Sequence, residues 1–215
     1  MATYIQMASD LRAVERLRKE KIKRVFAERW EEEIPASLDD LDLRDEGVRN
    51  KYFSVDTATN LNKWTSASPS LRDHNLAVVG TSSKAKSKIA VAALKMRVGK
   101  EASPPTIGYL NVLWLADDPD MSTERLNKVD YLLLDGLTAD PIPEKALVRL
   151  RYLADFRFTN GKKNVFATTL NDSQVRESYG ESFYGAMYSK TLFAVVKQVS
   201  TSSLPNSTLL SSGGM

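Results

Sequence analysis

The sequence of 215 residues contains no cysteine and only one histidine, His74. Without cysteine the chain can form neither a disulfide nor a thiolate metal site, and this absence fits a reducing cytoplasm. A single histidine nearly excludes a histidine-based metal site and a Ser-His-Asp triad. Disulfide-stapled scaffolds and enzymes built on several histidines are therefore set aside as function classes.

Long apolar runs are lacking as well. The longest, such as Tyr131 to Leu134, are far too short to span a bilayer. Residues 1–10 do not show the basic start and apolar stretch of a signal peptide. A net charge of +3 permits nucleic-acid contact without demanding it. We expect a cytoplasmic protein with no membrane partner.

Residues 7–33 are predicted to form one long charged helix, because they contain no glycine or proline and Pro35 follows them. An isolated helix of this length is marginal in water unless an apolar stripe is buried. The stripe consists of Leu11, Val14, Leu17, Ile22, Val25 and Phe26. We interpret it as a partner-docking surface. The alternatives are a solvated amphipathic helix and burial against the chain's own body.

From His74 onward, short apolar runs alternate with helical segments, which indicates a parallel α/β sheet. The predicted strands are 75–79, 108–115, 131–134, 164–168 and 192–199. The predicted helices are 55–67, 88–98, 143–158 and part of 173–184. We expect one domain over residues 34–199, preceded by the helical extension 1–33 and followed by a disordered serine-rich tail, 200–215.

A candidate phosphate-binding loop follows the first predicted strand. The pattern Gly-x4-Gly-Lys-[Ser/Thr] surrounds phosphates with backbone N–H groups, its lysine reaches the outer phosphates, and its hydroxyl holds Mg²⁺. Here Ala85 replaces the second glycine, and its methyl group narrows the backbone approach. The candidate nucleotide-binding residues are Gly80, Thr81, Ser82, Ser83, Lys84, Ala85, Lys86 and Ser87. The alternative is a polar loop whose lysine is solvated.

A carboxylate, Asp135, ends the third predicted strand. A Mg²⁺ site opposite the loop hydroxyl needs such a group, so Ser87 and Asp135 are the candidate metal ligands. Hydrolysis also needs a second carboxylate to polarise water, and the next position is Gly136. Asp140 could replace it only if the loop folds back. Asp135 could instead cap a turn after a core strand.

The order of these parts resembles the DnaC-type helicase loaders, an AAA+ family that includes the transposition helper IstB. The resemblance covers roughly residues 34–199. The matching segments are Ile34-Pro35, a helix ending near Trp64, Val91–Leu94, Asp135-Gly136-Leu137, Phe156-Arg157-Phe158, Asn164–Thr169 and Tyr179-Gly180-Glu181. The resemblance implies a P-loop NTPase (AAA+-like) parallel sheet flanked by helices, with ATP or ADP and Mg²⁺ as ligands.

The departures from the family all weaken catalysis. Thr169 stands where the sensor strand usually ends in asparagine, with Asn171 two residues late. The two arginine-finger positions hold Ser182 and Ala186, and Lys190 is the nearest cation. We therefore expect weak nucleotide binding and little or no hydrolysis, and we assign no catalytic residue.

The resemblance implies a loader or adaptor that binds a DnaB-type replicative helicase through its N-terminal helix, in a bacterial cell or encoded by a phage. It would oligomerise on the helicase and contact single-stranded DNA through a basic cluster: Lys84, Lys86, Lys88, Lys162 and Lys163. One alternative is a competent ATPase of unusual wiring that uses Asp140 and Lys190, and another is an IstB-like helper. A third is a phage or mobile-element inhibitor that keeps the fold without nucleotide. A small-molecule P-loop kinase is disfavoured because no arginine-rich lid segment is present.

Overall fold

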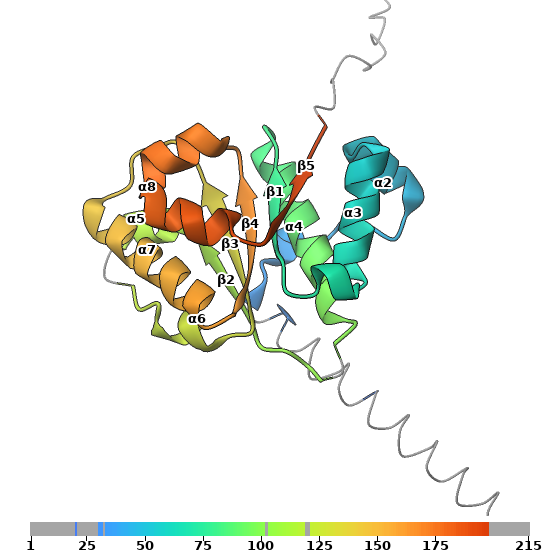
Figure 1. Ribbon diagram of the computed structural model, residues 1–215, viewed down its shortest axis with the longest axis horizontal. Coiled ribbons are helices and arrows are strands. Elements are labelled where there is room, and N and C mark those ends of the chain that lie inside the picture. The colour runs from blue at the N-terminus through green and yellow to red at the C-terminus, as the bar shows by residue number, and fades with distance from the viewer. Residues whose placement is uncertain (1–19, 21–29, 32, 102, 119–120, 198–215) are drawn as a thin grey trace, which may run out of the picture.

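A five-stranded parallel sheet with strand order β2-β3-β4-β1-β5 forms the centre of the molecule (Figure 1). The computed structural model describes residues 20, 30, 31, 33–101, 103–118 and 121–197. The strands are β1 (Asn75–Val79), β2 (Ile107–Asn111), β3 (Tyr131–Leu137), β4 (Lys163–Thr168) and β5 (Thr191–Val195). The predicted parallel α/β sheet is confirmed, and β1 pairs with β4 on one side and β5 on the other.

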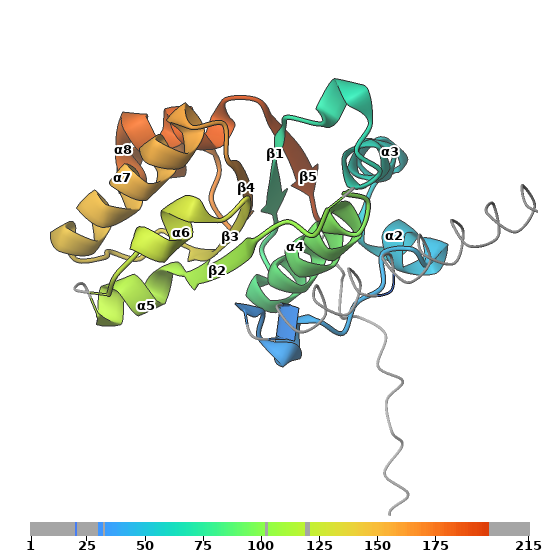
Figure 2. The same ribbon diagram turned by 90° about the horizontal axis from the view of Figure 1, so that it is seen from below.

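Helices cover both faces of the sheet (Figure 2). Those on one face include α2 (Glu46–Tyr52), α3 (Val55–Thr65) and α4 (Ser83–Val98). The other face carries α5 (Val112–Asp117), α6 (Glu124–Lys128), α7 (Glu144–Thr159) and α8 (Asp172–Tyr188). Two short 3₁₀ helices, η1 (Ala36–Leu38) and η2 (Pro69–Leu71), lie in the connections. Because helices cover both faces of the sheet, consecutive strand residues are buried, which explains why the strand sequences are continuous apolar runs.

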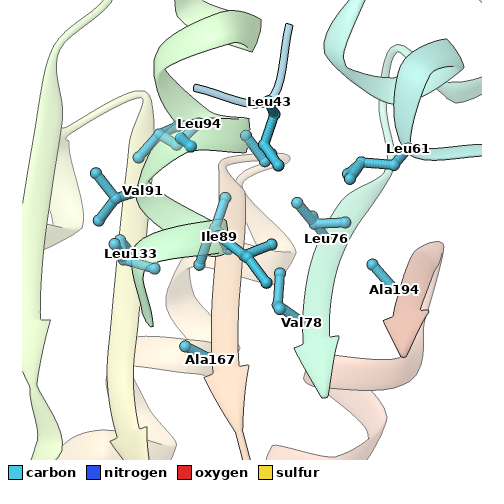
Figure 3. Close-up of a cluster of buried hydrophobic side chains, with 14 of the residues drawn as sticks. Leu43, Leu61, Leu76, Val78, Ile89, Val91, Leu94, Leu133, Ala167 and Ala194 are labelled. Atoms are coloured by element: carbon cyan, nitrogen blue, oxygen red, sulfur yellow. The ribbon is translucent and has the colours of Figure 1, made fainter. Parts of the chain in front are cut away.

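The larger core lies between the sheet and α4. Ile89 and Leu94 of α4 are fully buried and pack with Leu76 of β1. Figure 3 shows Leu61 of α3 and Leu43, which precedes α2, entering the same core. The segment between residue 34 and β1 is therefore part of the body of the domain.

The predicted N-terminal helix 7–33 is described only at residues 20, 30, 31 and 33, which are helical. Its apolar stripe, Leu11 to Phe26, lies outside the described residues, as does the predicted tail 200–215, and both stay predictions. Trp30 and Ile34 are buried in the core against α4. The chain is thus attached to the body directly after the stripe.

The second strand is shorter than predicted. The expected strand 108–115 is wrong beyond Asn111, because the side chain of Asn111 accepts a hydrogen bond from Leu113 N at 3.0 Å and starts α5. Val112 and Leu115 are then buried at helical spacing. The third strand is longer than predicted and continues to Leu137. Within the described ranges, no helix is long and apolar enough to cross a bilayer.

Arg157 on α7 is fully buried and holds the connections before β3 and β4 together. Its guanidinium donates to the carbonyls of Leu126, Val129 and Lys163 at 2.7, 2.9 and 2.7 Å, and to Asn164 Oδ1 at 2.7 Å. Burial lowers the pKa of Arg157 to about 10, so the group stays charged at neutral pH. The charge is accommodated because several carbonyl oxygens surround it.

We predict that Arg157→Met lowers the free energy of unfolding by about 3 kcal/mol, because four acceptors, three of them buried, lose their donor. Urea unfolding followed by circular dichroism measures the change. The control is Arg125→Met, since Arg125 forms an exposed ion pair with Glu33 that is worth about 1 kcal/mol at most. Equal losses in the two variants would contradict the structural role of Arg157.

Candidate nucleotide site at the carboxyl end of the sheet

The candidate phosphate loop is shorter than its sequence predicts. The expected loop, residues 80–87, is wrong after Ser82, because α4 begins at Ser83 and includes Lys86 and Ser87. The Ser82 hydroxyl accepts from Ala85 N at 3.4 Å, and the Ser82 carbonyl accepts from Lys86 N at 3.2 Å. Ala85 favours helix where a second glycine would disfavour it. The segment that would wrap phosphates is therefore the first turn of a helix.

Lys86 lies inside the protein, with only 1% of its surface exposed. The interpretation of a solvated lysine is therefore wrong. Burial lowers the pKa of its ammonium group, and the negative charge of Asp135 raises it in partial compensation. The lysine and this carboxylate belong to one electrostatic site.

Ser87 and Asp135, the two predicted Mg²⁺ ligands, meet as the sequence suggested. The Ser87 hydroxyl donates to Asp135 Oδ1 at 2.6 Å, and the Gly136 N–H donates to the same oxygen at 2.8 Å. The second oxygen, Oδ2, accepts from the Tyr109 hydroxyl at 3.1 Å. Asp135 thus pairs with the Ser87 hydroxyl, and its contact with Gly136 lies inside β3, which continues to Leu137, so the alternative of a cap after the strand is wrong.

Tyr109 is a site residue that sequence reasoning missed. It lies on β2, where it is the register partner of Leu133 on β3. Burial and the nearby charge of Asp135 raise the pKa of its hydroxyl, which remains a donor at neutral pH. The sequence shows a tyrosine two residues before the end of an apolar strand. This tyrosine could be assigned to the site of Asp135 only if β2 were already known to lie beside β3.

Gly136, where a hydrolytic acid is expected, adopts a left-handed conformation with φ of 75°. A Cβ at this position would lie 2.5 Å from Asn111 Oδ1, closer than any real contact. Asn111 cannot easily withdraw, because the same oxygen caps α5. The backbone at this irregular position of β3 therefore requires glycine, and a side chain with a carboxylate would clash with Asn111.

The two predicted sensor residues lie after β4. Asn171 caps α8 and forms a capping box with Gln174, and the backbone N–H of Thr169 reaches Leu137 O at 3.4 Å. Sequence reasoning missed Thr168, which is fully buried. Its hydroxyl donates to Leu137 O at 3.1 Å and accepts from Leu170 N at 3.0 Å, and its carbonyl accepts from Gly80 N at 3.1 Å. The end of β4 thus links the end of β3 with the candidate loop.

The two arginine-finger positions, Ser182 and Ala186, make local contacts. So do Asp140 and Lys190, the residues that could substitute for the missing acid and finger. Ser182 donates to Asp155 on α7, and Ala186 is buried in the core below α8. Lys190 occupies a tight turn with φ of 48°, and its carbonyl accepts from Asn75 N. The Asp140 carboxylate accepts from the Thr138 hydroxyl at 3.1 Å. These contacts do not bring Asp140 or Lys190 to Asp135.

The predicted basic cluster is not one patch. Lys84 and Lys88 are near the start of α4, at the carboxyl end of β1, whereas Lys162 precedes β4 and Lys163 is its first residue. Because the strands are parallel, these two groups lie at opposite edges of the sheet. Lys86 is buried, and Lys88 forms an ion pair with Asp40. The prediction that the five lysines act together is therefore wrong.

Mg²⁺ favours hard oxygen ligands and keeps several waters, and the hydroxyl of Ser87 and the carboxylate of Asp135 fit that chemistry. Among the described residues, no group of three or more histidine, cysteine, aspartate or glutamate side chains is placed to hold a metal ion. A bound magnesium would therefore depend on Ser87, Asp135, water and phosphate oxygens together.

Comparison with solved structures identifies the fold. The DnaC helicase loader matches with a TM-score of 0.55 and 16% identity, over 76% of this chain and 100% of that one. DnaI matches with a TM-score of 0.56 and 14% identity, over 76% and 95%. A candidate primosome component from Streptococcus pyogenes matches with 0.54 and 13%, over 76% and 90%. No family model and no curated protein matches the sequence. The described chain has the AAA+-like P-loop fold of the DnaC-type loaders.

In a DnaC-like sheet, as in other parallel sheets, ligands bind outside the carboxyl ends of the strands. Asp135 near the end of β3, Thr168 at the end of β4, and Lys86 and Ser87 after β1 meet at this edge. The fold therefore brings these polar residues together at the edge where parallel sheets bind their ligands.

We predict that Gly136→Ala lowers the free energy of unfolding by about 2 kcal/mol more than Gly161→Ala. Both glycines have positive φ, 75° and 63°, so the backbone penalty is shared. An added Cβ meets Asn111 at position 136 and nothing within 4 Å at position 161. Denaturant unfolding of the two variants measures the difference, and equal destabilisation would show that Asn111 yields.

Proposed function

We propose that this protein is a DnaC-like helicase loader or adaptor in DNA replication, which binds a DnaB-type replicative helicase in the cytoplasm of a bacterial cell. It binds ATP or ADP with Mg²⁺ weakly and hydrolyses little or none. The observation that carries this proposal is the DnaC-type fold together with the buried cluster of Lys86, Ser87 and Asp135. The proposed loader assembles as an oligomer on the helicase and is encoded by a bacterium or by a phage.

Weak nucleotide binding follows from the closed first turn of α4. Phosphates need the backbone N–H groups near Ala85 and the Lys86 ammonium, but these form a helical turn and a buried contact. Opening the turn reduces the fraction of binding-competent protein, and the apparent affinity falls by the same fraction. Ser87 and Asp135 would hold the Mg²⁺, whose charge would offset the phosphates.

Slow hydrolysis follows from the missing groups. Gly136 carries no acid that could polarise water, and its conformation with Asn111 above it leaves no room for one. Ser182 and Ala186 supply no cation to a neighbouring subunit. Loss of an arginine finger alone typically slows turnover by on the order of 10³-fold or more.

Calorimetry is expected to detect weak Mg²⁺–nucleotide binding to the wild type and none to Lys86→Ala. Ala85→Gly should bind about fivefold more tightly, because glycine disfavours the closed helical turn by about 1 kcal/mol. Steady-state turnover should stay near background in all three proteins. Turnover of about one per second that disappears in Asp135→Ala would contradict the proposed lack of hydrolysis.

The sealed site also favours a second candidate function. A phage or mobile-element inhibitor that keeps the AAA+-like body without nucleotide would have the same buried Lys86 and the same Ser87–Asp135 contact. No calorimetric heat for either the wild type or Ala85→Gly would select this function over the loader. Single-stranded DNA is a further proposed partner, contacted weakly and in a salt-sensitive way.

The helicase would dock on the apolar stripe of the N-terminal helix. Trp30 and Ile34 attach the chain to the body directly after that stripe, so a helicase held there would be linked closely to the AAA+-like body. This docking is the main test of the proposed function.

Leu17→Asp with Val25→Asp is expected to abolish capture of a DnaB-type helicase in a pull-down, because two charges interrupt the apolar stripe. The control is Ser9→Asp with Ala27→Asp, which adds the same charge at positions that helical spacing puts opposite the centre of the stripe. It should leave capture intact, and neither variant should move the melting temperature by more than about 2 °C. If the first variant melts many degrees lower, the stripe belongs to the protein's own core and docking through it is wrong.

A further inference from the structure

The carboxylate of Asp135 accepts hydrogen bonds on both of its oxygens. Oδ1 accepts from the Ser87 hydroxyl at 2.6 Å and from the Gly136 N–H at 2.8 Å. Oδ2 accepts from the Tyr109 hydroxyl at 3.1 Å. A carboxylate oxygen offers about two lone pairs, so Oδ1 has its full number of donors. A magnesium ion that uses this carboxylate therefore has to approach Oδ2, where the Tyr109 hydroxyl already lies.

The Tyr109 side chain is held in this position by packing. Only 7% of the residue is exposed, and it belongs to the core between the sheet and α4. Its ring meets the ring of Trp114 edge-on, with the centroids 5.4 Å apart. The side chain of Asn111 also hydrogen-bonds the Tyr109 hydroxyl. The hydroxyl is thus a fixed donor to Asp135 and not the end of a flexible arm.

The negative charge of Asp135 is compensated by groups of the protein itself. A carboxylate in the interior needs hydrogen-bond donors and positive charge around it. Ser87, Gly136 and Tyr109 supply the donors, and the buried Lys86 ammonium supplies positive charge. Magnesium therefore adds less at this carboxylate than it would at one that the protein leaves uncompensated.

Tyr109 is the donor that conflicts with a metal ion. The Ser87 oxygen keeps lone pairs for a metal while its proton stays on Oδ1. Tyr109 offers no comparable ligand, because burial and the charge of Asp135 raise the pKa of its hydroxyl and keep the proton in place. That proton points at Oδ2, and Asp135 is only 6% exposed, so little space remains there for magnesium and the waters it retains.

We propose that Tyr109 is a specificity-determining residue of this site, whose hydroxyl competes with magnesium for Asp135 and weakens the binding of the metal. A nucleotide is then held chiefly through Lys86, with little contribution from Mg²⁺. This inference rests on the nucleotide binding in the proposed function and adds the residue that sets its metal dependence.

The first test measures ADP affinity of the full chain by calorimetry, once in Mg²⁺ and once in EDTA. Mg²⁺ should tighten binding only slightly in the wild type. The ratio of the two affinities should be roughly tenfold larger in Tyr109→Phe, because Oδ2 loses a charge-assisted hydrogen bond that only the metal can replace. General loosening of the site would weaken ADP binding in both conditions and leave the ratio unchanged. An equal or smaller ratio in Tyr109→Phe would overturn the proposal.

The matched control is Tyr131→Phe. Tyr131 is the first residue of β3, at the opposite end of the strand from Asp135, and it is also almost fully buried. Its hydroxyl likewise donates to a carboxylate oxygen, Glu101 Oε1, at 2.5 Å. Tyr131→Phe should keep the wild-type ratio. Adding Asp135→Asn to Tyr109→Phe should abolish the gain, and a gain that survives this change would overturn the proposal.

The second test uses Mg²⁺ alone and follows thermal unfolding. Both Tyr109→Phe and Tyr131→Phe should melt below the wild type in EDTA, because each leaves a carboxylate without one donor. Mg²⁺ should raise the melting temperature of Tyr109→Phe more than that of Tyr131→Phe, since the metal binds the folded state at the freed oxygen. Equal responses of the two variants to Mg²⁺ would overturn the proposal.

A third measurement needs no substitution that could disturb folding. Inorganic pyrophosphate is the probe, because it does not absorb in the near ultraviolet. Tyrosine absorption in that range shifts to shorter wavelength when the hydroxyl stops donating to a carboxylate. Pyrophosphate with Mg²⁺ should produce this shift in the wild type, and pyrophosphate in EDTA should not. The same spectrum under both conditions would overturn the proposal.

Helicase capture by the same proteins separates this inference from the proposed function. Capture by the wild type, with equal metal ratios in Tyr109→Phe and Tyr131→Phe, leaves the loader function standing and removes the role of Tyr109. Capture absent from the wild type, with a metal response confined to Tyr109→Phe, removes the loader function and leaves the role of Tyr109 standing.

Discussion

Burial of α4 against the sheet is the constraint on which the rest of the molecule depends. Ile89, Val91 and Leu94 are fully buried, and the helix lies across β1, β4 and β3. A helix covered in this way can shift little without opening cavities in the core. Its position fixes where its first turn meets the carboxyl end of β3, and therefore where Ser87 meets Asp135.

Two local preferences compete at the start of α4. A phosphate loop requires an open backbone, whereas the Ser82 cap and Ala85 favour a closed helical turn. The turn closes, and Lys86 is drawn into the interior beside Asp135. Next to Asp135, the backbone of Gly136 lies so close to the side chain of Asn111 that a second acidic side chain has no space at this position. Lys86, Ser87 and Asp135 thus lie together, whereas the position next to Asp135 carries no second carboxylate.

Residues 39–42 contact the opposite face of the same helix, where Asp40 pairs with Lys88 and Asp39 pairs with Lys95. The inner face of α4 carries the Lys86–Ser87 cluster, and the outer face carries these two lysines. The segment lies between the buried residues Ile34 and Leu43, directly after the residues proposed to dock the helicase.

The sequence by itself determined the alternating strands and helices, the parallel sheet, and the pairing of Ser87 with Asp135, because apolar runs and the order of motifs are local signals. The tertiary structure alone decided the rest. Tyr109 joins the site only because β2 lies beside β3. Asp39 and Asp40 meet α4 across about fifty residues of chain, and no periodicity encodes such contacts. Burial of Lys86 likewise follows from packing. From the sequence alone, a lysine in a polar stretch is expected to be solvated, and only the position of α4 against the sheet shows that this lysine is buried.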